Sequence, residues 1–229
     1  MTRREMLDEL RGKIDDTSGR PKWTTGELLG WMAEGQDKFC EDTGFFTDVS
    51  SFSLTTVIGQ AVYDISERII EVKDLWRGNT RLGKYQEYMK TVGYPTSNAV
   101  FFNPNQADVA YYWQADEETG VLTLYPTPTT VETLTMRVWR YSKFSLDSND
   151  VDGKGLNAEP EIPFRFHRAC IEWAAYKAYS DHDAEKGDAM GAKDHLEAFK
   201  AYVSDGKKAI RRRQSEKTTV NGNPTYVVR

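Results

Sequence analysis

GVLTLYPTPTTVETLTMRVWRYS, residues 120–142, is the stretch that decides the fold class of this chain. Its β-branched, leucine and aromatic residues form two runs on either side of a proline-rich turn. Within the first run Val121 and Thr123 point to one side while Leu122 points to the other, a period of two that is typical of a strand. Prolines interrupt such runs. The stretch therefore predicts two consecutive strands.

Short runs of the same kind fill the chain between residues 47 and 145, and Gly, Pro and Asn separate them. They are FSLTTV (52–57), AVYDI (61–65), RIIEVKDLW (68–76), AVFFN (99–103) and VAYYWQA (109–115). A short helix is expected near Lys84–Thr91. We expect a strand-rich insert over residues 47–145, followed by a polar loop over residues 146–161.

On both sides of this insert, apolar residues recur at helical spacing. Thr24 and Glu27 form the pattern of a capping box, and Gly44 is suited to end the helix that begins there. The expected helices are Arg3–Ile14, Thr25–Asp42, Pro163–Asp181 and Asp183–Arg212. We therefore expect an α+β protein: a helical bundle of residues 1–46 and 162–213, with a β insert and an extended C-terminal tail over residues 214–229.

Composition is that of an ordinary folded protein, with 39% hydrophobic residues, a net charge of -5 and a pI near 5.4. An acidic chain is not expected to use nucleic acid as its main partner. Cys40 and Cys170 are too few for a disulfide framework and are expected to be reduced core thiols. No signal peptide or membrane-spanning run is recognisable, so we expect no membrane partner and assembly inside a cell.

Catalytic motifs are incomplete. Gly78–Tyr85 (GNTRLGKY) is similar to a phosphate-binding loop, but Tyr85 stands where Ser or Thr must bind magnesium, so we interpret it as a loop from a strand into a helix. His167 and Cys170 share a helix face as half of a metal site would, yet no second pair completes four ligands. The acidic residues of 181–185 are interpreted as a solvated turn. No catalytic, metal-binding or cofactor-binding residue is assigned, and no enzyme is expected.

The C-terminal segment differs in charge from the rest of the chain. Residues 206–229 hold seven basic residues and one acidic residue. Arg211, Arg212 and Arg213 could contact DNA phosphates, pair with an acidic protein surface, or form a solvated helix end. Beyond them, 218–220 and 225–228 are strand formers, and such an end can add a strand to the sheet of a partner.

Six Trp, twelve Tyr and ten Phe are many for this length, and most belong to the predicted strands. Bases or sugars could stack on such rings. The alternative interpretation is a β-domain core together with a subunit interface, where Tyr and Trp are enriched.

Three segments, taken in order, resemble bacteriophage head-to-tail adaptor proteins, especially those of short-tailed phages. They are TTGELLGWMAEGQDKFCEDTGFF (24–46), GVLTLYPTPTTVETLTMRVWRYSKFSL (120–146) and IPFRFHRACIEWAAYKAYSDHDAEKGDAMGAKDHLEAFKAYV (162–203). The resemblance implies a subunit of a twelve-membered ring between the portal protein and the tail tube or nozzle, in the neck of the virion. It implies assembly in the host cytoplasm and a channel through which double-stranded DNA passes without specific binding. Residues 1–22 lie outside the match.

In the proteins that this chain resembles, C-terminal segments reach into the portal. The resemblance therefore implies that the basic end docks to the portal and that the β insert faces the tail. The residues expected to dock are Lys207, Lys208, Arg211, Arg212, Arg213, Lys217, Tyr226, Val227, Val228 and Arg229. Two alternatives remain open at this point: a nucleic-acid-binding module that uses the same basic segment, and a carbohydrate-binding or cell-wall-active tail protein with a carboxylate pair in an aromatic cleft.

Overall fold

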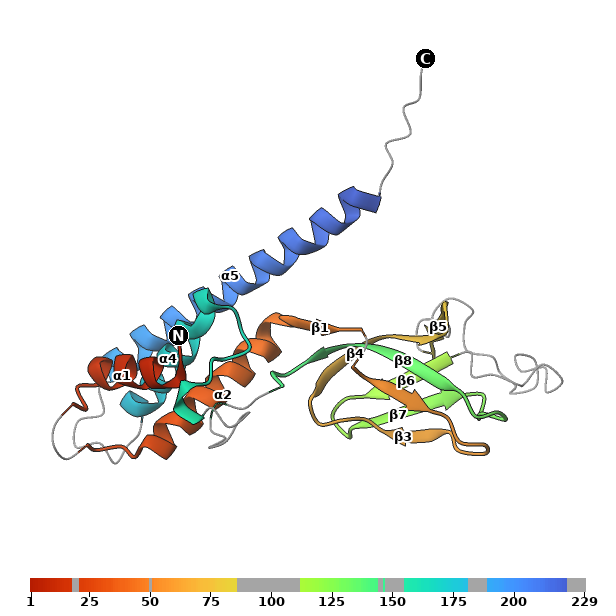
Figure 1. Ribbon diagram of the computed structural model, residues 1–229, viewed down its shortest axis with the longest axis horizontal. Helices are drawn as coiled ribbons and strands as arrows, with labels where there is room; N and C mark the ends of the chain where they lie inside the picture. Colours follow the sequence, from red (N-terminus) through yellow and green to blue (C-terminus); the bar gives the residue numbers. More distant parts are fainter. Residues whose placement is uncertain are drawn as a thin grey trace, which may run out of the picture. The chain divides into compact units, whose positions relative to one another are not determined.

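The computed structural model describes residues 1–17, 21–49, 51–85, 112–143, 146, 155–180 and 189–221. The chain divides into two compact units (Figure 1). Met1–Phe45 and Ser142–Arg229 form the first, which we call the helical unit. Phe46–Tyr141 form the second, which we call the β unit. The chain thus leaves the helical unit once and returns to it.

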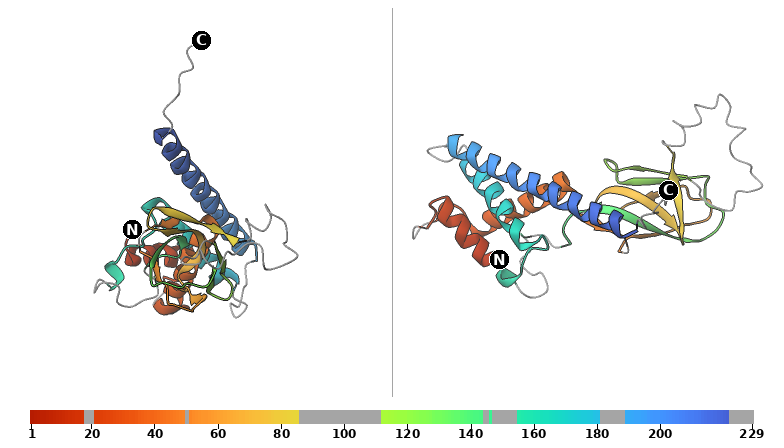
Figure 2. Two further views of the ribbon diagram at one scale, coloured as in Figure 1. Left: turned by 90° about the vertical axis from the view of Figure 1, so that its right-hand side faces the viewer. Right: turned by 90° about the horizontal axis from the view of Figure 1, so that it is seen from above.

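Four α-helices make up the helical unit within its described residues: α1 (Arg3–Lys13), α2 (Thr25–Thr43), α4 (His167–Ser180) and α5 (Ala189–Asn221), with short 3-10 turns η2 (Gly155–Asn157) and η3 (Phe164–Phe166). Capping boxes begin α1 at Thr2 and α2 at Thr24, and Gly44, in the left-handed region, ends α2. Helix α4 packs against α1, α2 and α5, and Figure 2 shows α5 running alongside α4.

Small residues allow these helices to approach closely. The α4 residues that are buried include Ala169, Ala174, Ala175 and Ala178. From α2, Gly35 lies against the Trp173 side chain, so closely that a Cβ at this position would be 2.7 Å from the Cβ of Trp173. A β-carbon on Gly206 of α5 would lie within 2.9 Å of Phe39 and of Thr43. Glycine at both positions is therefore required by packing.

A buried carboxylate connects three of the helices. Glu172 of α4, 6% exposed, accepts a hydrogen bond from Nζ of Lys13 at 2.5 Å and lies 2.7 Å from Nδ1 of His195. The three residues belong to α4, α1 and α5. Because a buried charge is tolerated only when it is paired, these contacts fix the side-chain registry of α1 and α5 on α4.

The β unit is an eight-stranded mixed sheet, which curls on itself (Figure 1). Strand β8 pairs antiparallel with β1, β2 and β4, and β5 and β6 run parallel. The sheet order is β1-β8-β4-β5-β6-β7-β3, and β2 lies off this path on β8. The strands are β1 (Phe46–Asp48), β2 (Ser53–Thr55), β3 (Val62–Asp64), β4 (Ile69–Arg77), β5 (Thr80–Lys84), β6 (Tyr112–Asp116), β7 (Val121–Tyr125) and β8 (Thr133–Arg140).

The concave side of this sheet encloses its own hydrophobic core. Trp113 is 2% exposed, and its indole N–H donates to the carbonyl of Leu82 at 3.2 Å. Alternate residues of β8 are buried, as the period of two predicts. The other buried members of the cluster are Tyr63, Ile69, Val72, Leu75, Leu82, Leu122, Leu124, Leu134, Met136 and Val138.

The expected fold class, a helical bundle with a strand-rich insert and an extended tail, is therefore wrong. The chain combines four helices with a large curled mixed sheet that has a separate core. The tail expectation also fails over residues 214–221, because α5 continues to Asn221. The sequence after Ile210 lacks an amphipathic period, but Lys, Arg, Gln and Glu are good helix formers and extend the helix without one. Residues 222–229 lie outside the described residues.

Gly78–Tyr85 is a second correction. The segment was expected to lead from a strand into a helix, but it is the hairpin between β4 and β5, with Arg77 paired to Thr80. Gly78 has the positive φ of +54° that the first position of a two-residue hairpin turn requires. Of the helix expected over Lys84–Thr91, Lys84 belongs to β5, Tyr85 is helical, and residues 86–91 lie outside the described part of the chain. None of the described helices is both long and apolar enough to cross a membrane.

Substituting Gly35→Ala is expected to destabilise the protein by about 1–3 kcal/mol, because the new Cβ forces α2 away from Trp173. Gly30→Ala, on the same helix but with no heavy atom within 4 Å of the added Cβ, is the matched control and is expected to stabilise by about 0.5–1 kcal/mol. Urea unfolding of both variants measures the difference. Equal effects of the two substitutions would contradict the close approach of α2 and α4.

His167 is expected to make the protein acid-sensitive. It is 2% exposed, its Nε2–H donates to the Ile162 carbonyl at 2.8 Å, and burial lowers its pKa below the ordinary value of about 6.5. The unfolded chain therefore binds this proton more readily than the folded chain. The stabilisation is complete above about pH 6.5 and is lost as the pH falls through the lowered pKa.

Urea unfolding of the wild type and of His167→Gln between pH 8 and pH 5 tests this. The wild type should lose more unfolding free energy on acidification than the variant. An identical pH dependence in both proteins would show that His167 does not titrate on unfolding.

Candidate functional site

The second half of α5 carries the basic residues that the sequence analysis selected. Lys207, Lys208, Arg211 and Arg212 are exposed and recur at helical spacing on one face. The opposite face holds the buried residues Phe199, Val203 and Gly206. The amphipathicity of α5 thus turns four cations away from the bundle; we call them the basic face.

Pairing within the basic face is sparse. Nζ of Lys208 lies 2.9 Å from Oδ1 of Asp205, one turn earlier. Among the described residues no carboxylate pairs with Lys207, Arg211 or Arg212. Unpaired cations on one face are attractive to an acidic partner surface or to phosphates.

The remaining predicted residues are not brought onto this face. The guanidinium of Arg213 turns towards the body of the helical unit and lies 4.9 Å from the ring centre of Phe45. Lys217 belongs to α5, but its side chain lies outside the described part. Tyr226, Val227, Val228 and Arg229 lie outside it altogether.

Packing of α5 ends before the helix does. Ile210 is the last residue with partial burial, and the five residues 211–215 are all exposed. Figure 1 shows this end of α5 extending beyond the other helices of its unit. The part of α5 beyond Ile210 is short, and a short helix is only marginally stable in water without a buried face, because most helical stability in proteins comes from packing. A partner that covers this segment would supply the missing contacts.

Beside the basic face, η3 and α5 enclose a hollow of about 320 Å³. Its lining comprises Arg165, Phe166, Tyr202, Asp205, Lys208, Ala209 and Arg212. Sequence reasoning missed Arg165 and Phe166, because only the packing of η3 beside α5 brings them near Arg212, and it also missed Tyr202, which lies on α5 itself. No local pattern signals that neighbourhood.

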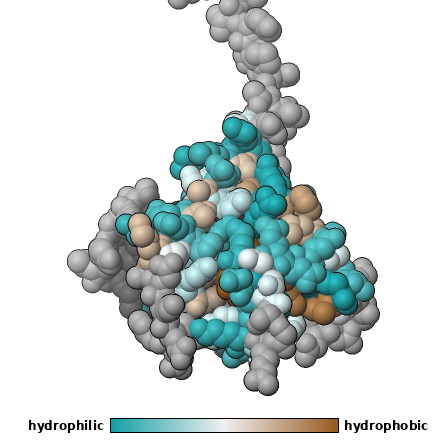
Figure 3. Space-filling view, turned by 90° about the vertical axis from the view of Figure 1, so that its left-hand side faces the viewer, coloured by the Kyte–Doolittle hydropathy of each residue, from teal (hydrophilic) through white to brown (hydrophobic). Residues whose placement is uncertain are grey.

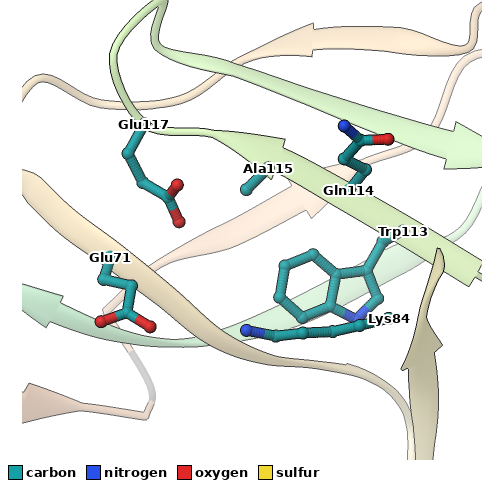
Figure 4. A pocket seen from close by; sticks show the side chains of 6 residues that line it. All are labelled: Glu71, Lys84, Trp113, Gln114, Ala115 and Glu117. Carbon is teal, nitrogen blue, oxygen red and sulfur yellow. The ribbon is translucent and has the colours of Figure 1, made fainter. Parts of the chain in front are cut away.

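A second hollow lies in the β unit, between β4, β5 and β6 (Figure 4). Figure 4 shows Lys84 lying along the Trp113 ring, with its Nζ 4.9 Å from the ring centre. Glu71 forms an ion pair with Lys73, and Glu117 accepts a hydrogen bond from the Val72 amide. A sugar ring would find the one tryptophan of this hollow buried and covered by a lysine, so the arrangement does not favour carbohydrate stacking.

Other aromatic rings of the β unit also engage one another or cations rather than open surface. Tyr85 stacks on Tyr125 at 4.4 Å, and Nζ of Lys73 lies 3.2 Å from the ring centre of Trp139. These contacts favour the interpretation of the aromatic residues as core and packing elements. Phe101, Phe102 and Tyr111 lie outside the described part.

Exposed aliphatic residues gather at two loops of the β unit. Val57 and Ile58 follow β2, Val131 precedes β8, and they are 50%, 64% and 64% exposed. We call these three residues the apolar tip. By contrast, hydrophilic residues predominate on the face of the molecule drawn in Figure 3, where apolar residues form only small patches.

Hydrogen bonds between the two loops hold the apolar tip in place. The Thr56 amide donates to the Glu132 carbonyl at 2.8 Å and the Gly59 amide donates to the Pro128 carbonyl at 2.9 Å. The Thr56 hydroxyl donates to the Thr130 carbonyl and accepts from the Glu132 amide. The tip is therefore preorganised, and neither 49–63 nor 119–131 contains a charged residue.

His167 and Cys170 both lie in the core of the helical unit. Burial raises the pKa of Cys170, which disfavours the reactive thiolate. Within the described residues no group of three His, Cys, Asp or Glu could hold a metal ion. The acidic cluster at 181–185 lies outside these residues.

Comparison with known proteins gives one match. The family model described as SU10 adaptor protein matches residues 1–224. The match includes both units and residues 1–22. No curated protein matches the sequence.

Proposed function

Because this chain belongs to the SU10 adaptor protein family, a family of phage head-to-tail adaptors, it is a structural component of a bacteriophage virion, and we propose that it joins the portal protein to the tail tube or nozzle. The observation that carries the proposal is the basic, unpacked end of α5, on a chain that matches an adaptor family over 224 of its residues. The proposed position is the neck of the virion, with assembly in the host cytoplasm.

We propose that α5 is the portal-docking element. The basic face is exposed and three of its four cations are unpaired among the described residues. The helix projects past its own packing, so a partner can surround it without disturbing the core. Charge complementarity with an acidic portal surface would guide docking and fix its orientation.

The apolar tip is proposed to contact the tail-side protein. Cores of protein interfaces are depleted of charge, and the two loops that form the tip are uncharged in a chain with 28% charged residues. Hydrogen bonds hold both loops, so docking costs little conformational entropy. The docking surfaces of α5 and of the apolar tip differ in chemistry, which lets one subunit distinguish two partners.

A closed ring of identical subunits, twelve by analogy with the adaptors that this chain resembles, is the proposed assembly. The net charge of -5 suits a channel through which double-stranded DNA slides without specific binding, since like charges repel. The exposed basic face also supports a second candidate, direct binding of DNA phosphates by α5. That candidate predicts affinity of the isolated subunit for DNA that falls steeply with salt.

Deleting residues 211–229, which removes Arg211 and Arg212 with the rest of the exposed end of α5, is expected to abolish portal binding while the helical unit stays folded, because no described side chain beyond Ile210 is packed in the core. Mass photometry of the subunit with the portal protein of the same phage measures complex formation. Lys193→Glu, an exposed cation on α5 remote from the basic face, is the control and should bind normally. Normal attachment of the truncated protein would refute the docking role of this end.

Ile58→Asp is expected to weaken binding of the tail-side protein by about tenfold or more, since it places a charge in the centre of an apolar contact. Portal binding and thermal stability should not change, because the Ile58 side chain is 64% exposed. Val49→Asp, at an aliphatic residue outside the tip that is 53% exposed, is the matched control. If the two variants bind the tail protein equally well, the tip is not the contact.

A further inference from the structure

We propose that the hollow between η3 and α5 is a socket for an acidic side chain, supplied by the protein that docks on α5. The inference rests on the proposed portal docking and deepens it, because it assigns a ligand chemistry to seven lining residues: Arg165, Phe166, Tyr202, Asp205, Lys208, Ala209 and Arg212. Three of them are cations and one is an acid.

The guanidinium groups of Arg165 and Arg212 form no ion pair with a carboxylate of the described residues, whereas Asp205 is already engaged by Lys208 at 2.9 Å. Guanidinium is planar and matches a carboxylate with two parallel hydrogen bonds. The pairing state of the lining therefore leaves room for one more carboxylate and disfavours a further cation.

Arg165 is held over the hollow by its neighbour. Its guanidinium carbon lies 4.5 Å from the ring centre of Phe166, and Phe166 is itself 3% exposed and anchored on Phe39 and Phe45. A cation stacked on a fixed ring loses less freedom on binding than a free side chain does. The socket is thus partly formed before the ligand arrives.

The apolar part of the lining indicates which residues would flank the acidic side chain of the ligand. Phe166 and Ala209 present carbon atoms beside the guanidinium groups, and a volume of about 320 Å³ suits a side chain rather than a folded segment. An acidic residue followed or preceded by an apolar one fits these features.

Protein is favoured over DNA as the source of the acid. A phosphate backbone presents a row of charges that fits an open basic face, whereas this site is a concave hollow with three cations, one of which is already paired with Asp205. The outer cations Lys207 and Arg211 do not line the hollow and would serve DNA equally well. The lining of the hollow therefore favours an acidic side chain of a protein over the phosphates of DNA.

The test compares neighbouring cations of the full-length protein in binding to the portal protein of the same phage. The double variant Arg165→Glu/Arg212→Glu should lose binding by about tenfold or more, the size expected when a charge-assisted pair becomes a repulsive one. Lys207→Glu/Arg211→Glu, which makes the same change of net charge on the basic face but outside the hollow, should lose several-fold less. Circular dichroism checks that each variant is folded.

Two probes test the socket independently of the portal. Hexaglutamate and a short double-stranded oligonucleotide are titrated into wild type and the Arg165→Glu/Arg212→Glu double variant by calorimetry. Hexaglutamate should bind the wild type and not the double variant. Binding of the oligonucleotide alone, lost in the double variant, would identify a phosphate site and overturn the proposal.

The portal experiment separates the two hypotheses. If Lys207→Glu/Arg211→Glu weakens portal binding as much as Arg165→Glu/Arg212→Glu does, docking is a diffuse charge effect and the socket is refuted while portal docking stands. If wild type fails to bind the portal yet binds hexaglutamate through Arg165 and Arg212, the socket stands and portal docking fails.

Discussion

Close packing of α4 against its three neighbours is the constraint on which the helical unit depends. Alanines on α4 and Gly35 of α2, which lies against Trp173, bring α4 close to its neighbours, and Gly206 brings α5 close to Phe39 and Thr43 of α2. Across this packing Glu172 of α4 reaches Lys13 of α1 and His195 of α5. A side chain at either glycine would force the helices apart. The direction of α5, and hence the presentation of its basic face, follows from this packing.

The proposed function assigns two kinds of recognition to the two units. The helical unit offers cations on a helix that has left its own core, so contact there depends on charge and on salt. The β unit offers aliphatic side chains on loops fixed by backbone hydrogen bonds, so contact there depends on shape and apolar burial. An adaptor between two different proteins benefits from surfaces that do not compete for one partner.

Within the helical unit, general attraction and specific recognition also fall on different residues. Lys207 and Arg211 face outward and can steer any acidic surface. Arg165 and Arg212 converge on a concave site with an aromatic floor, which selects for the position of a single carboxylate. Long-range attraction and local fit are thus supplied by different residues, and α5 contributes to both.

The sequence by itself determined the helix positions, the alternation of the strands, the basic face of α5 and the adaptor family, because each depends on residues close together in the chain or on their order. Three predictions from the sequence were wrong: that the strands form an insert in a helical bundle, that Gly78–Tyr85 leads directly into a helix, and that residues 214–221 are extended. Only the tertiary structure decided that Arg165 lies beside Arg212 and that Val131 lies beside Val57. These neighbours are 47 and 74 residues apart, and only the packing of whole elements brings such residues together.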